Sequence, residues 1–162
     1  MEKQRLPCRA HGRGFTLVEM TITICILVAV AALTMPRWAR SLQRYNIDSA
    51  AKRIVADLGR ARRLGFTTSA TQTVNFNVSA NQYTIPGLSD PNNPTAIYTV
   101  TLSSAPYNST LISTNLGGQP VTYNGYGVPV GLPAGGGKIV IAAGQLQHTI
   151  TIDPTDGTAT IQ

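Results

Sequence analysis

Residues 15–35 read FTLVEMTITICILVAVAALTM, an apolar run that contains a single ionisable residue, Glu19. As a helix rising ~1.5 Å per residue, this run would be about 31 Å long, close to the thickness of a bilayer's hydrocarbon core. Its threonines make the run less apolar, but in a helix their hydroxyls can donate hydrogen bonds to carbonyls of the preceding turn. Trp38 follows where an interfacial aromatic is expected. The run therefore predicts a transmembrane helix over residues 15–36, after a basic leader at residues 1–14.

Pro36 ends the apolar run, but helical periodicity resumes behind it. Apolar residues recur there at steps of three and four, which places them in one stripe on a helix. We expect a single long helix with a kink near Pro36, an amphipathic second half at residues 37–65, and a stop at Gly65. The stripe, which we expect to cover the following domain, consists of Leu42, Tyr45, Ile47, Ala51, Ile54, Leu58 and Ala61.

After Gly65 the apolar period changes to two, and turn signals rich in Gly, Asn, Pro and Ser separate short alternating runs. This pattern predicts an antiparallel, sandwich-like sheet domain at residues 66–162, and Asp156-Gly157 is a strong hairpin signal. The expected fold class is α+β, with a long transmembrane and amphipathic helix packed on this β domain. The predicted strands are Thr73–Val78, Gln82–Ile85, Ala96–Leu102, Thr110–Ser113, Pro120–Tyr123, Lys138–Ala142, His148–Ile152 and Thr158–Ile161.

The net charge of +6 is distributed unevenly along the chain. Residues 37–63 carry eight arginines and lysines against two aspartates, whereas residues 64–162 carry one lysine, Lys138, against three aspartates. The predicted globular part is therefore faintly acidic. A phosphate backbone needs a cluster of cations, so nucleic-acid binding by this part is not expected.

Residues 13–20, RGFTLVEM, combine a glycine–phenylalanine junction with one carboxylate four residues further on, at the start of an apolar helix. With the basic leader before it and Pro36 behind it, this stretch resembles the processing site of type IV prepilins and pseudopilins. The resemblance implies a pilin-like fold in which a prepilin peptidase cuts after Gly14 and methylates the new amino group of Phe15. A glycine before the cut leaves the scissile bond unencumbered.

The same resemblance implies that Glu19 is an assembly residue. A carboxylate in an apolar environment is costly unless it finds a cation, and the new ammonium of Phe15 on a neighbouring subunit would supply one. The expected role is structural, with neither enzymatic activity nor a cofactor. The expected partners are the peptidase, other pilins or pseudopilins and an inner-membrane assembly platform. The expected location is the bacterial inner membrane as a single-pass protein with the domain in the periplasm, and then a periplasmic or surface filament.

Residues 50–62, followed by strands, resemble the GspH/FimT branch of minor pilins. The glycine-rich segment 124–129 and the glycine-turn hairpin 150–161 also fit that branch. The resemblance implies a minor pseudopilin of a type II secretion apparatus. The alternative is a FimT-like minor pilin of a type IV pilus that serves adhesion, motility or DNA uptake. A membrane-anchored enzyme or binding module is a third, more remote alternative.

Few side chains outside the N-terminal segment suggest chemistry. Asp153 and Asp156 flank a Pro-Thr pair, which is typical of a hairpin turn, with calcium binding as the alternative. His148 lies in a strand pattern with no cysteine, aspartate or second histidine close to it in sequence, so we expect a surface or half-buried side chain. No catalytic combination of side chains with sensible spacing stands out.

Overall fold

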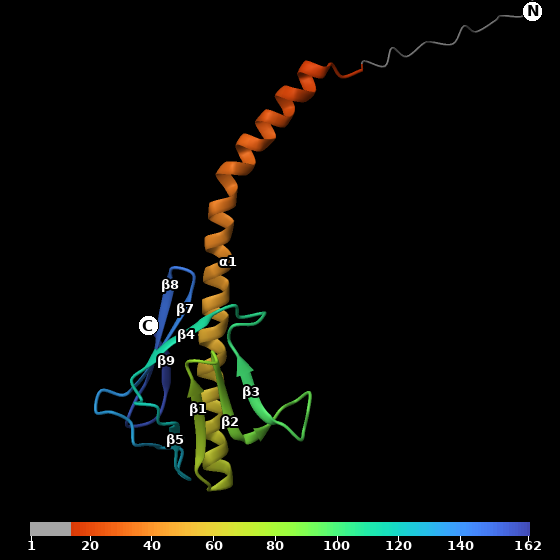
Figure 1. Ribbon diagram of the computed structural model, residues 1–162. Helices are drawn as coiled ribbons and strands as arrows, with labels where there is room; N and C mark the ends of the chain where they lie inside the picture. Colours follow the sequence, from red (N-terminus) through yellow and green to blue (C-terminus); the bar gives the residue numbers. More distant parts are fainter. Residues whose placement is uncertain (1–13) are drawn as a thin grey trace, which may run out of the picture. The chain divides into compact units, whose positions relative to one another are not determined.

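The protein is described by a computed structural model that covers residues 14–162, except for the side chains of residues 33–37. Within these residues a single helix, α1 (Leu17–Thr68), precedes nine β-strands (Figure 1). The chain divides into two compact units, Met1–Ala39 and Arg40–Gln162, and α1 contributes to both. Apart from Gly14, the predicted leader lies outside the described residues. The side chain of Pro36, where a kink is predicted, also lies outside the described part of the structure.

The prediction of a transmembrane helix at residues 15–36 is wrong. Among the residues that the structure describes, no helix is both long and apolar enough to cross a membrane. A span of this kind needs about 20 consecutive apolar residues. Glu19 and the two threonines Thr21 and Thr23 interrupt the apolar residues at the start of α1. The expected fold class, a membrane-crossing helix on a β domain, is therefore replaced by one long helix followed by two antiparallel sheets.

Every strand pair in the second unit is antiparallel, and the strands form two sheets with the orders β3-β2-β1-β5-β6 and β4-β7-β8-β9. The eight predicted strands are all present, with ends that differ by a few residues. A ninth short strand, β6, was not predicted. The bounds are β1 Gln72–Asn77, β2 Gln82–Ser89, β3 Ile97–Thr101, β4 Thr110–Thr114, β5 Val121–Tyr123, β6 Pro129–Val130, β7 Gly137–Ala143, β8 Leu146–Ile152 and β9 Ala159–Ile161.

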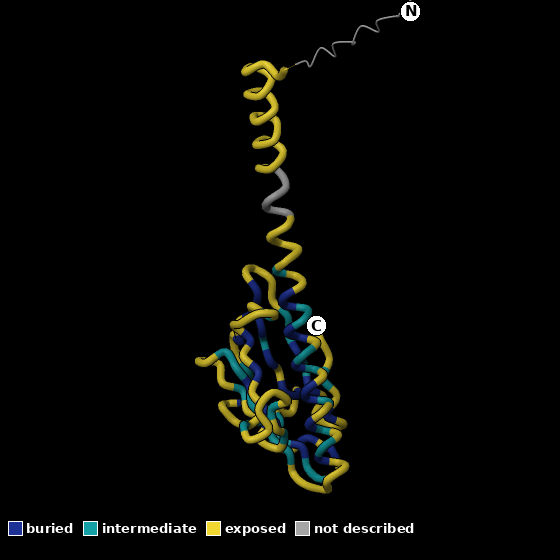
Figure 2. Tube along the Cα trace, turned by 90° about the vertical axis from the view of Figure 1, so that its right-hand side faces the viewer, coloured by how far each residue is buried: buried dark blue, intermediate teal, exposed yellow. Residues whose placement is uncertain are grey.

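One hydrophobic core joins the second half of α1 to both sheets of this unit (Figure 2). Five members of the predicted helix stripe are buried in it, because their spacing of three and four places them on one helix face. The first two members, Leu42 and Tyr45, are instead exposed. The helix residues that belong to this core are Ile47, Ala50, Ala51, Ile54, Leu58 and Ala61.

Helix α1 continues past the predicted stop at Gly65 and ends at Thr68. Ser69 follows with a φ of 50°, the left-handed conformation that commonly closes a helix, and the Ala70 N–H donates to the Gly65 carbonyl. Gly65 instead allows the backbone of the 124–128 turn to lie close to the helix, because a Cβ at this position would be only 3.0 Å from the carbonyl oxygen of Asn124. This glycine therefore positions the 124–128 turn against the end of the helix.

Candidate processing and assembly site

The predicted cleavage site lies in non-helical backbone immediately before α1. Gly14, Phe15 and Thr16 have no regular secondary structure, and α1 begins at Leu17. Gly14 is exposed, and 74% of the Phe15 surface is accessible. Because proteolysis requires an extended, accessible backbone, the bond between Gly14 and Phe15 lies where a peptidase can reach it.

Thr16 and Glu19 form a reciprocal cap at the start of α1. The Glu19 N–H donates to Oγ1 of Thr16 at 3.2 Å, and the Thr16 N–H donates to Oε2 of Glu19 at 3.5 Å. This is the geometry of a capping box, in which two backbone N–H groups without a partner inside the helix find side-chain acceptors. The cap fixes where the helix begins, two residues after the predicted cut.

The Glu19 carboxylate keeps acceptor capacity beyond the cap. Its bond to the Thr16 N–H is long, and the side chain is exposed. An ionised carboxylate offers about four lone-pair sites, and capping takes one of them. A cation from another chain can therefore bind Glu19 without breaking the cap.

Large apolar side chains are exposed along the first turns of α1 (Figure 2). The threonines among them are satisfied locally, as predicted: the Thr21 and Thr23 hydroxyls donate to the carbonyls of Val18 and Glu19. An exposed apolar surface of this kind is typical of a region that another molecule covers. The exposed residues, with 50% to 80% of their surface accessible, are Phe15 just before the helix and Leu17, Val18, Met20, Ile22, Ile24, Ile26, Leu27, Val28 and Val30 on it.

A buried carboxylate on the second half of α1 was not anticipated from the sequence. Asp57 is 5% exposed and accepts hydrogen bonds from the hydroxyls of Tyr83 at 2.7 Å and Tyr98 at 2.8 Å. The Arg53 guanidinium donates to the same carboxylate at 3.1 Å and also contacts the Tyr98 hydroxyl. Arg60 lies over the Tyr98 ring, 5.7 Å from its centroid. The cluster ties the helix to strands β2 and β3.

Burial makes the tyrosines of the core poor acids. It raises the pKa of Tyr83 far above its ordinary value, and the charge of Asp57 raises it further. The pKa of Tyr98 is raised by burial and by its hydrogen bond to Asp57. Burial also raises the pKa of Tyr123 to about 12. These hydroxyls therefore serve as hydrogen-bond donors and core groups at neutral pH.

His148 is half-buried, as expected, but it has a partner that its sequence neighbours did not reveal. Its Nε2 lies 2.8 Å from Oδ1 of Asp48, which comes from α1, and both side chains are partly exposed. The pair connects strand β8 to the helix. A sequence separation of 100 residues hid it from sequence analysis.

The Asp153 and Asp156 carboxylates stabilise the turn in which they lie. Asp153 accepts the N–H of Thr155 at 2.7 Å, and Asp156 accepts both the N–H and the hydroxyl of Thr158. These are the local bonds of a β-turn, so the predicted hairpin between β8 and β9 is confirmed. Within the described part of the chain, no group of three or more His, Cys, Asp or Glu side chains gathers in a way that could hold a metal ion.

A hollow of about 670 Å³ lies between the two sheets and is lined by neutral residues of β1, β2, β4 and their loops. The lining offers hydrogen bonds and contains no ionisable group, and its polar side chains are Asn75, Asn77, Gln82, Thr84, Ser113 and Thr114. A smaller hollow of about 340 Å³ contains Arg53 and Asp90. Neither lining includes a histidine or a cysteine.

No protein-family model matches the chain, and no curated protein or solved structure is significantly similar to it.

Proposed function

We propose that this chain is a structural subunit of a type IV pilin-like filament, and more specifically a minor pseudopilin of a type II secretion system. A prepilin peptidase would cut it after Gly14 and methylate the amino group of Phe15. The processed helix would then pack against the helices of other pilins or pseudopilins, with an assembly platform as a further partner. The resulting filament would be periplasmic or exposed at the cell surface.

The observation that carries this proposal is the exposed apolar start of α1. The core of the second unit is filled by its own residues, including the helix side chains from Ile47 to Ala61. The apolar side chains from Phe15 to Val28 remain exposed and require a partner outside this chain. Helices of neighbouring subunits provide such a partner, because apolar side chains at helical spacing interlock when helices pack.

The surroundings of Gly14 support processing at this position. A Cβ added to Gly14 would meet no atom of the described residues within 4 Å. The fold therefore places no demand on this glycine. A requirement for it would come from the peptidase, whose cleft must fit the extended backbone on both sides of the cut.

The cap at the start of α1 supports the role proposed for Glu19. After cleavage, the chain would begin at Phe15 with a free amino group, one helical turn from Glu19. The Glu19 carboxylate can accept this ammonium from a neighbouring subunit while it continues to cap its own helix. Pairing would neutralise both charges within an apolar filament core and would set the register between subunits.

The secreted proteins of a deletion strain test the assignment to a secretion system. Wild-type, deletion and complemented strains would be compared by mass spectrometry of the culture medium. Loss of specific secreted proteins, restored on complementation, is the expected result. An unchanged set of secreted proteins would reject the secretion pseudopilus and favour a minor pilin of a type IV pilus, for which surface pili and DNA uptake would be assayed.

A further inference from the structure

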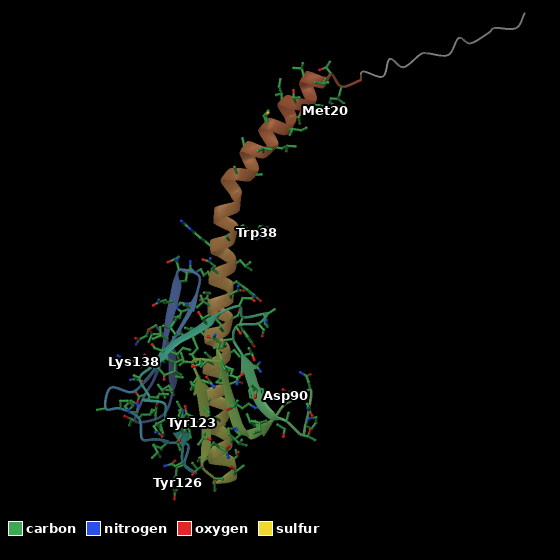
Figure 3. All side chains as sticks on the ribbon, viewed as in Figure 1. Met20, Trp38, Asp90, Tyr123, Tyr126 and Lys138 are labelled. Atoms are coloured by element: carbon green, nitrogen blue, oxygen red, sulfur yellow. The ribbon has the colours of Figure 1, made fainter. Side chains whose placement is uncertain are left out.

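Two exposed aromatic side chains and two arginines share one surface where α1 ends. Phe66 is 66% exposed and Tyr126 is 83% exposed, and both line a hollow of about 400 Å³ together with Arg62 and Arg63. Figure 3 shows Tyr126 projecting from the domain close to this end of the helix. We call Arg62, Arg63, Phe66 and Tyr126 the aromatic–arginine surface.

The turn that carries Tyr126 is held firmly. Oδ1 of Asn124 accepts the N–H groups of Tyr126 at 2.9 Å and Val128 at 3.0 Å. Nε of Arg62 donates to the Gly127 carbonyl at 3.2 Å, which ties the turn to the helix. The exposed position of Tyr126 is therefore fixed by the fold.

The glycines on both sides of Tyr126 show how closely this turn approaches the end of the helix. A Cβ at Gly125 would lie 2.8 Å from the carbonyl oxygen of Ser69, and Gly127 has a φ of +71°. Side chains are not tolerated at either position without movement of the backbone. Rigid, solvent-exposed aromatics flanked by arginine are the usual composition of interface hot spots, because little conformational entropy is lost when they bind.

The charges of the residues that line this hollow indicate which class of partner fits it. The hollow is lined by two arginines and no acidic side chain, and Arg63 makes no ion pair within the described residues. A phosphate backbone would need a longer track of cations. The pKa of the Asp156 carboxyl is lowered by its hydrogen bonds from Thr158 and, to a smaller extent, by the charge of Arg62, so one carboxylate already lies near this arginine. The small number of arginines therefore favours a partner with a few carboxylates rather than a polyanion.

We infer that the aromatic–arginine surface binds a second protein through a segment in which carboxylates flank an apolar side chain. The apolar side chain would lie between Phe66 and Tyr126, and the carboxylates would pair with Arg62 and Arg63. This inference does not depend on the proposed filament function, since it concerns only the described surface of the domain.

Site-specific crosslinking of the full chain in the cells that produce it tests the inference. A photoreactive phenylalanine derivative would replace Tyr126, and the peptide crosslinked to it would be identified by mass spectrometry. The expected result is a peptide from another protein with at least two carboxylates near an apolar residue. Arg63→Glu should lower the crosslink yield by about tenfold or more, whereas Lys138→Glu, a matched reversal elsewhere on the domain, should leave it within about twofold.

Several outcomes would overturn the inference: no crosslink, a crosslink to nucleic acid, one to a second copy of this chain, or one to a peptide without carboxylates. A yield that Arg63→Glu does not change would also reject it. Phe66→Ser serves as a second variant, and circular dichroism would verify that both variants fold. Arg63 and Phe66 are exposed, so neither substitution disturbs the core.

Discussion

The hydroxyl of Tyr83, on strand β2, donates a 2.7 Å hydrogen bond to the carboxylate of Asp57, on helix α1. Both side chains are buried, and the same carboxylate also accepts the Tyr98 hydroxyl and the Arg53 guanidinium. A buried charge is tolerated only when its hydrogen-bonding capacity is satisfied, so this cluster fixes how the helix is seated on the sheet.

Asp57→Asn should lower the free energy of unfolding by about 2–3 kcal/mol, because the new amide group faces hydroxyl and guanidinium donors and the charge partner of Arg53 is lost. Urea-induced unfolding followed by circular dichroism would measure the change. Asp90→Asn provides the control: this residue is half-buried, and its carboxylate accepts the N–H of Asn92, a bond that the asparagine oxygen can keep. Its substitution should change stability by no more than about 0.5 kcal/mol. Equal effects of the two substitutions would rule out a structural role for the cluster.

The raised pKa of Tyr123 predicts a loss of stability at alkaline pH. Its pKa is 10.0 in an ordinary setting and about 12 in the fold, so the folded state favours the neutral phenol. The stabilisation is complete below pH 10 and is lost as the pH rises toward 12, amounting to ~3 kcal/mol at most. Unfolding free energies measured across this range should fall more steeply for the wild type than for Tyr123→Phe. Parallel curves would contradict the assignment.

Thr16→Ala should loosen the first turn of α1. It removes the hydroxyl that accepts the Glu19 N–H, and loss of such a cap costs about 1 kcal/mol. The Glu19 amide should then exchange its hydrogen roughly fivefold faster in deuterated water. Thr16→Ser keeps the acceptor and should exchange like the wild type. A similar acceleration in both variants would mean that the cap does not hold the helix start.

Glu19→Gln separates capping from charge at the assembly residue. Glutamine can replace glutamate in a capping box but cannot neutralise an ammonium. Both Glu19→Gln and Glu19→Ala should therefore be cleaved after Gly14 yet fail to enter filaments, as judged by immunoblotting of sheared filaments. If the glutamine variant were incorporated normally while the alanine variant was not, capping alone would explain the role of Glu19.

Much of the second unit could be predicted from the sequence, because alternation and turn residues are local signals. Eight strands and the hairpin at Asp156-Gly157 follow from them. Strand β6 has only two residues, which is too short for a period of two to be visible. The helix end was placed too early, since Gly65 is required for contact with the 124–128 turn rather than for a stop.

The features that were missed depend on distant partners or on a neglected local motif. Asp57 is surrounded in sequence by basic residues and resembles a solvent-exposed charge, whereas its tyrosine partners are 26 and 41 residues away. Asp48 and His148 are farther apart still. By contrast, the cap between Thr16 and Glu19 has a readable signal, a threonine followed three residues later by a glutamate. The prediction of a membrane span relied on the apolar run and on Trp38 behind it, and it was wrong.

Gly14→Val examines the requirement for glycine before the cut. Because a Cβ at this position would meet no described atom within 4 Å, folding should be unchanged while cleavage by a prepilin peptidase is lost. Circular dichroism and gel mobility would measure the two properties separately. Cleavage that continued at the wild-type rate would show that the peptidase does not recognise this glycine.

Processing between Gly14 and Phe15 is measured most directly by the intact mass of the chain produced with and without a prepilin peptidase. The predicted result is a chain of residues 15–162 that carries one N-terminal methyl group, found only when the peptidase is present. A chain that keeps residues 1–14 in the presence of an active peptidase would contradict the proposed function.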